Sequence, residues 1–209
     1  MHKKGKSALA YLMVLIAMAF VALTLAIVLM PLPDLDKNVS KAVQSFQSPA
    51  LYKVMRLVSD FGVMPFSVLM VLITALVFFL FKYKREALFV LFTLFCGVAS
   101  TLIKYLVDRP RPAAPFVQVM EKTRQQSFPS GHVNFYVLFF GFILVLMFHM
   151  NSIPKLVRMV VGGFSAGMIL LVPYSRIYLG AHWFTDVLGG ILLGSLLLYV
   201  NSYYYLRKK

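Results

Sequence analysis

The chain has 209 residues, of which 60% are hydrophobic and 13% charged, and its mean hydropathy is +0.81. These values exclude an ordinary soluble domain and predict an integral membrane protein. The formal net charge of +14 does not indicate a nucleic-acid partner, because the basic residues occur in small groups between apolar runs. The single cysteine, Cys96, excludes an intramolecular disulfide framework and a thiolate metal cluster.

Six apolar segments predict an all-α bundle of six transmembrane helices in one domain, residues 1–209, because a helix needs about 20 apolar residues to cross a bilayer. The first segment follows Lys3, Lys4 and Lys6 and lacks a convincing cleavage site, so we interpret it as an anchored span and not as a cleavable signal. The predicted spans are residues 7–30, 62–81, 87–107, 133–148, 157–173 and 183–203.

Residues 31–60, between the first two predicted spans, mix apolar with charged residues, and Asp34 and Asp36 lie near their start. This pattern predicts short interfacial amphipathic helices with a break at Pro49. An ordinary solvated loop is the alternative.

Six spans place both termini on one side of the membrane, together with the second and fourth connections. Basic residues lie directly at the span ends on this side, which the positive-inside rule makes cytoplasmic. The opposite side carries nearly as many, but these lie in the interfacial segment and in the polar clusters below. We therefore expect a multi-pass protein of the cell (plasma) membrane with both termini cytoplasmic. The cytoplasmic basic residues are Lys3, Lys4, Lys6, Lys82, Lys84, Arg85, Lys155, Arg158, Arg207, Lys208 and Lys209.

Polar residues cluster where the third predicted span ends and the fourth begins. Lys104 and Arg111 lie around the end of the third span, and charges so close to hydrocarbon need partners or a function. Ser130, Gly131 and His132 directly precede the fourth span. The free N–H groups and the dipole of a helix N-terminus favour an anion there.

A third cluster lies between the fifth and sixth predicted spans. Ser175 and Arg176 follow the fifth span, while His182 and Asp186 begin the sixth, four residues apart and so on one helical face. The ends of spans three and five and the starts of spans four and six must all lie at the same face of the membrane. We expect the clusters to converge there, at the extracytoplasmic face, as a phosphate-binding site.

These clusters resemble the three signature motifs of the type 2 phosphatidic acid phosphatase superfamily, in its bacterial lipid-phosphatase branch, to which phosphatidylglycerophosphatase B belongs. The first motif is Lys, six residues and Arg-Pro; the second is Pro-Ser-Gly-His; the third is Ser-Arg, five residues, His, three residues, Asp. Every fixed position is present and in order. The matching residues are Lys104, Arg111, Pro112, Pro129, Ser130, Gly131, His132, Ser175, Arg176, His182 and Asp186.

The resemblance implies a metal-independent phosphomonoesterase that works through a phosphohistidine intermediate and needs no cofactor. It implies that His182 is the nucleophile, that Asp186 orients it and that His132 is the acid and base. Substrate phosphate would be bound by Lys104, Arg111, Ser130, Gly131 and Arg176. A bell-shaped dependence of activity on pH is expected.

The expected partners are a lipid phosphate substrate and the bilayer, with no nucleic acid and no obligate protein partner. Phosphatidylglycerol phosphate is the favoured substrate, and undecaprenyl pyrophosphate and phosphatidic acid are alternatives. A phosphotransferase would use the same site with a lipid or sugar hydroxyl in place of water. A transporter of anions or lipids would use the cations only for binding and would not need His182.

Several other residues lie outside the fixed positions of the motifs. Arg109, Lys122 and Arg124 either contact the substrate headgroup or face water. His149 is expected to be an ordinary polar residue at the cytoplasmic end of the fourth span. Trp183 fits both an aromatic belt and a place beside the nucleophile. Three glycines of the last span are expected to allow close packing of helices; they are Gly189, Gly190 and Gly194.

Overall fold

Helices make up all the regular secondary structure of the residues that the computed structural model describes, which are 3–30, 33–121, 123 and 125–207. This confirms the all-α class. The helices are α1 (Lys3–Leu29), α2 (Asp34–Val43), α3 (Pro49–Asp60), α4 (Phe66–Leu80), α5 (Lys84–Phe92), α6 (Phe95–Val107), α7 (Gly131–His149), α8 (Lys155–Tyr178) and α9 (Phe184–Leu206).

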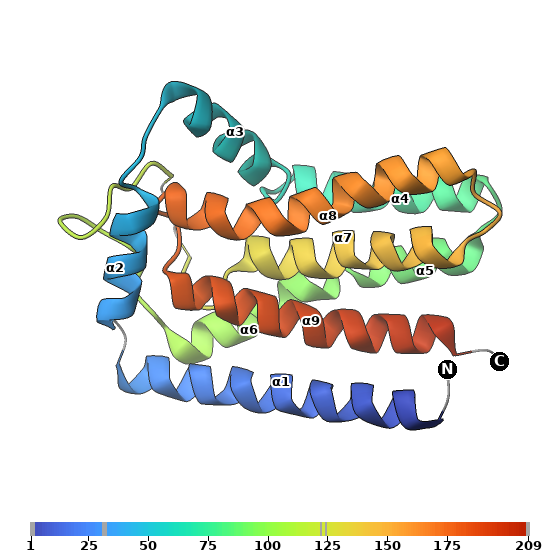
Figure 1. Ribbon diagram of the computed structural model, residues 1–209, viewed down its shortest axis with the longest axis horizontal. Helices are drawn as coiled ribbons and strands as arrows, with labels where there is room; N and C mark the ends of the chain where they lie inside the picture. The colour runs from blue at the N-terminus through green and yellow to red at the C-terminus, as the bar shows by residue number, and fades with distance from the viewer. Residues whose placement is uncertain (1–2, 31–32, 122, 124, 208–209) are drawn as a thin grey trace.

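Helix α7 lies at the centre of the bundle, between α8 and α9 (Figure 1). In its most apolar stretch 72% of the residues are buried, against 6% in α1, which lies at the edge of the bundle against α9. Close packing of α7 and α9 depends on glycine, as predicted. A Cβ atom at Gly194 would lie 2.8 Å from the Cβ of Val137, and one at Gly190 would lie 2.8 Å from the carbonyl oxygen of Ser130. Gly189 packs in the same way against the ring of Phe128.

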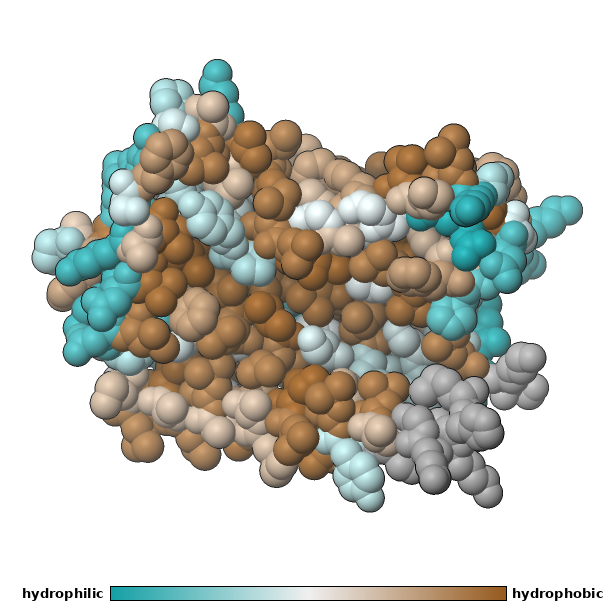
Figure 2. Space-filling model, in the orientation of Figure 1, coloured by the Kyte–Doolittle hydropathy of each residue, from teal (hydrophilic) through white to brown (hydrophobic). Residues whose placement is uncertain are grey.

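Several helices are long and apolar enough to cross a membrane. The described residues contain five such candidates: Ala8–Leu29, Lys84–Val107, Gly131–His149, Lys155–Tyr178 and Phe184–Leu206. Figure 2 shows a hydrophobic band around the middle of the visible face, with hydrophilic residues at both ends of the long axis. The chain is therefore a multi-pass membrane protein.

The second predicted span corresponds to α4, which is apolar but has only 15 residues. The third contains two helices, α5 and α6, joined by a tight turn. The N–H groups of Thr93 and Leu94 bond to carbonyl oxygens three residues back, at Val90 and Leu91, which interrupts the α-helical pattern.

The helix of the fifth predicted span extends beyond the predicted end of that span at Pro173. Helix α8 continues through this proline to Tyr178. Proline removes one backbone hydrogen bond from a helix, but the following turn is held by contacts that a local pattern does not reveal. The hydroxyl of Ser175 donates to the carbonyl oxygen of Met55 at 2.6 Å, and both Ser175 and Arg176 are fully buried.

Two short helices, α2 and α3, occupy the connection between α1 and α4. The side chain of Ser48 caps α3 by accepting from the N–H of Leu51 at 3.1 Å, and Pro49 lies in its first turn, where it removes no helical bond. Helix α2 lies across one end of the bundle and α3 lies alongside the end of α8 (Figure 1).

Candidate active site

The three sequence clusters lie together at the end of the bundle that α2 covers. This end is opposite to the start of α1 and the end of α9 (Figure 1). Lys104 lies in the last turn of α6, Ser130 is the N-cap residue of α7, and Arg176 lies in the last turn of α8. Gly131 and His132 are the first residues of α7. Asp186 lies in the first turn of α9, so four helices contribute to one polar region.

Lys104 and Arg111 bind the backbone of the loop that joins α6 to α7, and Arg111 also binds the turn between α8 and α9. The Lys104 ammonium donates to the carbonyl oxygen of Gln126 at 2.5 Å. The Arg111 guanidinium donates to the carbonyl oxygens of Gln125 at 2.5 Å and Ala181 at 2.7 Å. Burial, and next the charge of Arg176, lower the pKa of Arg111 to about 10, so this residue remains a cation at neutral pH.

Arg176 is fully buried and keeps part of its guanidinium unused. Its Nη1 donates to the hydroxyl of Ser59 and to both carboxylate oxygens of Glu121, at 3.0 and 2.9 Å. Its Nε and Nη2 have no hydrogen-bond partner among the described residues. A buried guanidinium donor that lacks a partner is costly, and an anionic ligand would remove that cost.

Two further buried atoms of the site share this property. In the part of the chain that is described, the Ser130 hydroxyl and Nε2 of His132 also lack partners. Arg176, Arg111 and Lys104 surround the His132 ring, and the ring of His182 also lies near it. Cationic and neutral donors thus surround the start of α7, where backbone N–H groups and the helix dipole also favour negative charge.

His182 lies in the turn between α8 and α9, two residues before α9 begins. It was expected to share a helical face with Asp186, and because it precedes the helix it does so only approximately. The two side chains nevertheless meet, because Nδ1 of His182 is 3.5 Å from Oδ2 of Asp186. The other ring nitrogen, Nε2, is 3.4 Å from Nη1 of Arg111. Burial is the main cause that lowers the pKa of His182 well below its usual value, followed by the charges of Arg111, Lys104 and Arg176. The imidazole is therefore neutral at pH 7.

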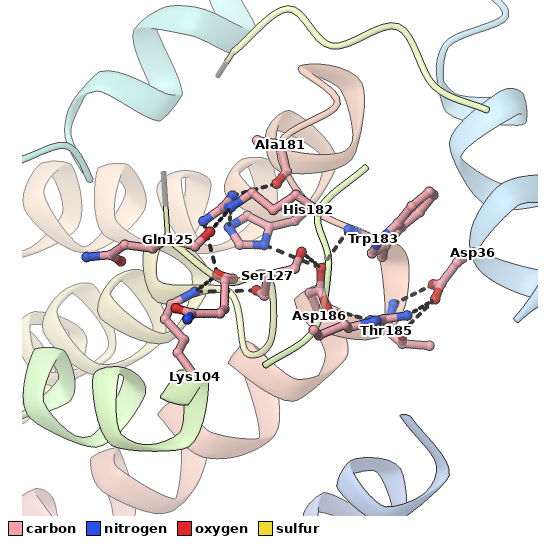
Figure 3. Close-up of polar contacts among 12 residues, drawn as sticks. Asp36, Lys104, Gln125, Ser127, Ala181, His182, Trp183, Thr185 and Asp186 are labelled. Carbon is pink, nitrogen blue, oxygen red and sulfur yellow. Dashed lines mark hydrogen bonds and ion pairs between the residues drawn. The ribbon is translucent and has the colours of Figure 1, made fainter. Parts of the chain in front are cut away.

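Asp186 is fully buried and held by several donors (Figure 3). Its Oδ1 accepts from Nη1 of Arg109 at 2.5 Å. Its Oδ2 accepts from the N–H of Trp183 at 2.8 Å and from the hydroxyl of Ser127. The indole of Trp183 donates to the carbonyl oxygen of Pro110 at 3.1 Å, so this buried residue lies beside His182 and not in an exposed aromatic belt.

Arg109 neither faces water nor lies free for a headgroup, which were the two expectations for it. Its side chain is 0% exposed and forms ion pairs with Asp186 and with Asp36 of α2. Lys122 and Arg124, given the same two roles, lie outside the described residues. His149 is exposed at the end of α7, and its Nδ1 lies 2.9 Å from the carbonyl oxygen of Val145.

Sequence reasoning missed several residues that support this region. Asp36 is fully buried, Glu121 holds Arg176, and Ser59 contacts both Glu121 and Arg176. Gly62 is equally unmarked in sequence, yet a Cβ atom there would lie 2.4 Å from Cδ2 of His132. Of these residues only Asp36 carried a signal in the sequence, as one of two carboxylates near the start of the predicted interfacial segment. Among the described residues, no group of three or more His, Cys, Asp or Glu residues is arranged to hold a metal ion.

Several known proteins are similar to this chain. The family model described as PAP2 superfamily matches residues 85–209. Phosphatidylglycerophosphatase B of Bacillus subtilis (strain 168) is 31% identical over 185 residues, which cover 87% of this chain and 88% of that protein. The undecaprenyl-diphosphatase of Sulfolobus acidocaldarius is 31% identical over 146 residues, which cover 59% of this chain and 66% of its own.

A solved structure shares the fold. The crystal structure of the transmembrane PAP2-type phosphatidylglycerolphosphate phosphatase from Bacillus subtilis superimposes with a TM-score of 0.80 and 27% sequence identity, and covers 92% of this chain and 94% of that one. The motifs, the fold and the match over most of the chain lead to one assignment. The chain belongs to the PAP2 superfamily and is a phosphatase that hydrolyses phosphate esters.

Proposed function

We propose that this protein dephosphorylates phosphatidylglycerol phosphate to phosphatidylglycerol at the extracytoplasmic face of the cell membrane, through a phosphohistidine intermediate. The observation that carries the proposal is a set of buried donors beside a neutral imidazole, for which the described part of the chain offers no hydrogen-bond partner. These donors are Nε and Nη2 of Arg176 and the Ser130 hydroxyl, with Nε2 of His132 beside them. A phosphoryl group supplies several acceptor oxygens at once and would satisfy them.

Charge neutralisation in this proposal comes from side chains. The non-bridging oxygens of the phosphate would accept from Arg176, Arg111 and Lys104, from the Ser130 hydroxyl and from the N–H of Gly131. Donors fixed in a buried site stabilise the charge that spreads over these oxygens in an in-line transition state. We therefore propose that catalysis needs no metal ion, and we expect phosphate release to persist in the presence of a chelator.

The first chemical step would be the attack of Nε2 of His182 on phosphorus. Asp186, next to Nδ1, would hold the ring in the tautomer that leaves a lone pair on Nε2 and would stabilise the cation that forms. As the new P–N bond forms, the ester P–O bond breaks. His132 would donate its proton to the departing lipid oxygen, which leaves as an alcohol.

The second step would return the enzyme to its starting state. His132, now neutral, would take a proton from a water molecule as that water attacks phosphorus. The P–N bond breaks, inorganic phosphate is released, and His182 is again neutral. If a lipid or sugar hydroxyl took the place of water, the same residues would catalyse phosphate transfer, which is the alternative function.

The substrate assignment depends on similarity to the Bacillus subtilis phosphatidylglycerophosphatase B, which extends over most of both chains. Slower action on undecaprenyl pyrophosphate and phosphatidic acid is expected. The similarity to the archaeal undecaprenyl-diphosphatase covers a smaller share of the chain and makes that activity the second candidate.

We further propose six membrane spans, with α4 as the second and with α5 and α6 together as the third. A 15-residue helix is about 22 Å long, shorter than the roughly 30 Å hydrocarbon core, so α4 would need the turns at its ends to complete the crossing. In this arrangement α2 and α3 lie at the outer interface, and both termini lie in the cytoplasm with the basic turns.

The experiment is phosphate release by purified protein from phosphatidylglycerol phosphate, undecaprenyl pyrophosphate and phosphatidic acid, measured side by side. His182→Ala should abolish turnover of all three. His149→Ala is the matched control, because His149 is exposed at the opposite end of α7, and it should behave as wild type. Residual turnover by His182→Ala would refute the nucleophile, and preference for the pyrophosphate would refute the substrate assignment.

A further inference from the structure

A buried chain of charges links α2 to Asp186. Asp36, Arg109 and Asp186 all have fully buried side chains. Nη2 of Arg109 is 2.6 Å from Oδ2 of Asp36, and Nη1 is 2.5 Å from Oδ1 of Asp186. The guanidinium is therefore shared between two carboxylates, only one of which belongs to a sequence motif.

Asp36 also holds the start of α9. Its Oδ1 accepts from the N–H of Thr185 at 2.8 Å, and its Oδ2 accepts from the Thr185 hydroxyl at 2.7 Å. That hydroxyl in turn accepts from Nη1 of Arg109 at 2.7 Å. Thr185 directly precedes Asp186, so Asp36 fixes the backbone next to Asp186 as well as the cation that binds it (Figure 3).

The shared guanidinium matters for charge. If Arg109 were bound to Asp186 alone, the pair would be neutral, and Asp186 would stabilise a cationic imidazole poorly. With Asp36 present, the three residues carry one net negative charge in a buried region where charges interact strongly. Asp36, which supplies the extra negative charge, lies on the side of Asp186 that is away from His182 (Figure 3).

We propose that Asp36 is a positioning residue for the phosphatase reaction. Through Arg109 and Thr185 it anchors Asp186. It also supplies a negative charge that stabilises the positive charge that develops on the His182 ring during the reaction. The inference rests on the proposed function, because it needs His182 as the nucleophile and Asp186 as its partner. Asp36 lies in α2, about 70 residues before the first motif. The role proposed for it does not require contact with the substrate.

The test compares Asp36→Asn with Asp34→Asn. Both aspartates lie in the first turn of α2, but Asp34 is 87% exposed and pairs only with Lys37 of the same helix in the described contacts. Asp36→Asn keeps the shape of the side chain and removes its charge. We expect kcat to fall by about 10- to 100-fold, as for other residues that support a functional group through one intermediary, with KM little changed. Asp34→Asn should match wild type.

A pH profile separates positioning from mere structural support. Other charged or titratable groups around His182 are Lys104 of α6, Arg111, His132 of α7, Arg176 of α8 and Asp186 of α9. All of these remain in Asp36→Asn, so the loss of one negative charge should make His182 harder to protonate. The acid-side inflection of kcat/KM should move to lower pH. A loss of folded protein alone would reduce the rate at every pH and leave the inflection in place.

Thr185 provides a second test if Asp36→Asn does not fold. Thr185→Val removes the hydroxyl that bonds to both Asp36 and Arg109 and leaves their direct ion pair in place, whereas Thr185→Ser keeps the hydroxyl. We expect Thr185→Val to lower kcat and Thr185→Ser to retain it.

The proposal is overturned if Asp36→Asn or Thr185→Val matches wild type in kcat, or if Asp36→Asn lowers the rate without moving the inflection. His182→Ala, assayed in parallel, separates the two levels. If it is inactive while Asp36→Asn is normal, only the role of Asp36 is refuted. If it is active, the proposed function fails as well.

Discussion

Gly62 offers a demanding test of the site, because it lies outside every motif and bears no functional group. In Gly62→Ala the new Cβ atom would lie 2.4 Å from Cδ2 and 2.9 Å from Cγ of His132. Carbon atoms pack at about 3.5 Å or more, so the ring would have to move by about 1 Å. The new atom would also lie 3.0 Å from Cε2 of Tyr136, so a second ring would have to shift as well.

A displacement of this size should lower the catalytic rate strongly and the free energy of unfolding only modestly. Misplacement of a reacting group by 1 Å can cost about 10²-fold in rate, whereas overpacking of a buried region typically costs about 1–3 kcal/mol. We therefore expect kcat of Gly62→Ala to fall by about 10²-fold with a smaller change in KM. The assay is phosphate release by purified protein, together with a thermal melt to measure the folded fraction.

The control is Gly163→Ala in α8, where a Cβ atom would meet nothing within 4 Å. This change should leave activity unaltered and stabilise the helix by up to about 1 kcal/mol. If Gly62→Ala were folded and within threefold of wild-type kcat, the placement of His132 against Gly62, or its role in proton transfer, would be refuted.

Three further predictions concern charge and orientation. Arg111→Ala and Arg176→Ala should each reduce kcat/KM by about 10² or more in the phosphate-release assay, since donors to a developing oxyanion contribute that much. Because the pKa of His182 is lowered by burial and by these cations, wild-type activity should persist as pH falls through 6.5, and Arg111→Ala should move the acid-side inflection to higher pH. Finally, a membrane-impermeant maleimide should label a cysteine at Asp34 in intact cells and one at Lys155 only after permeabilisation; the reverse pattern would refute the orientation.

Local sequence patterns were sufficient to predict those features of the structure that depend mainly on residues close together in the chain. Long apolar runs predicted the helices, and Pro-Ser-Gly-His before such a run predicted a helix N-terminus, which begins at Gly131. Because antiparallel helices alternate in direction, the order of the motifs along the chain also placed Lys104, His132 and Arg176 at one end of the bundle.

The supporting residues depend on contacts between distant segments, and a sequence pattern does not reveal these. Asp36 and Arg109 are 73 positions apart and pair only because α2 folds over the end of the bundle. Arg109, as a loop cation, was expected to face water or the headgroup, but two carboxylates from other elements make its burial favourable. Pro173 shows the same limit, because contacts from Ser175 and Arg176 to α3 extend a helix beyond a residue that usually ends one.

The most direct test of the central claim is to identify the residue that carries the phosphoryl group. A His132→Ala variant should form the phosphoenzyme from an activated aryl phosphate, whose leaving group needs no acid, and should hydrolyse it slowly because the base is missing. After a short reaction with labelled substrate, an alkaline quench and trypsin digestion, the label should be acid-labile and lie in the peptide of residues 177–207, whose only histidine is His182. A label in residues 125–155, which retain His149 in this variant, or an acid-stable ester elsewhere, would contradict the account.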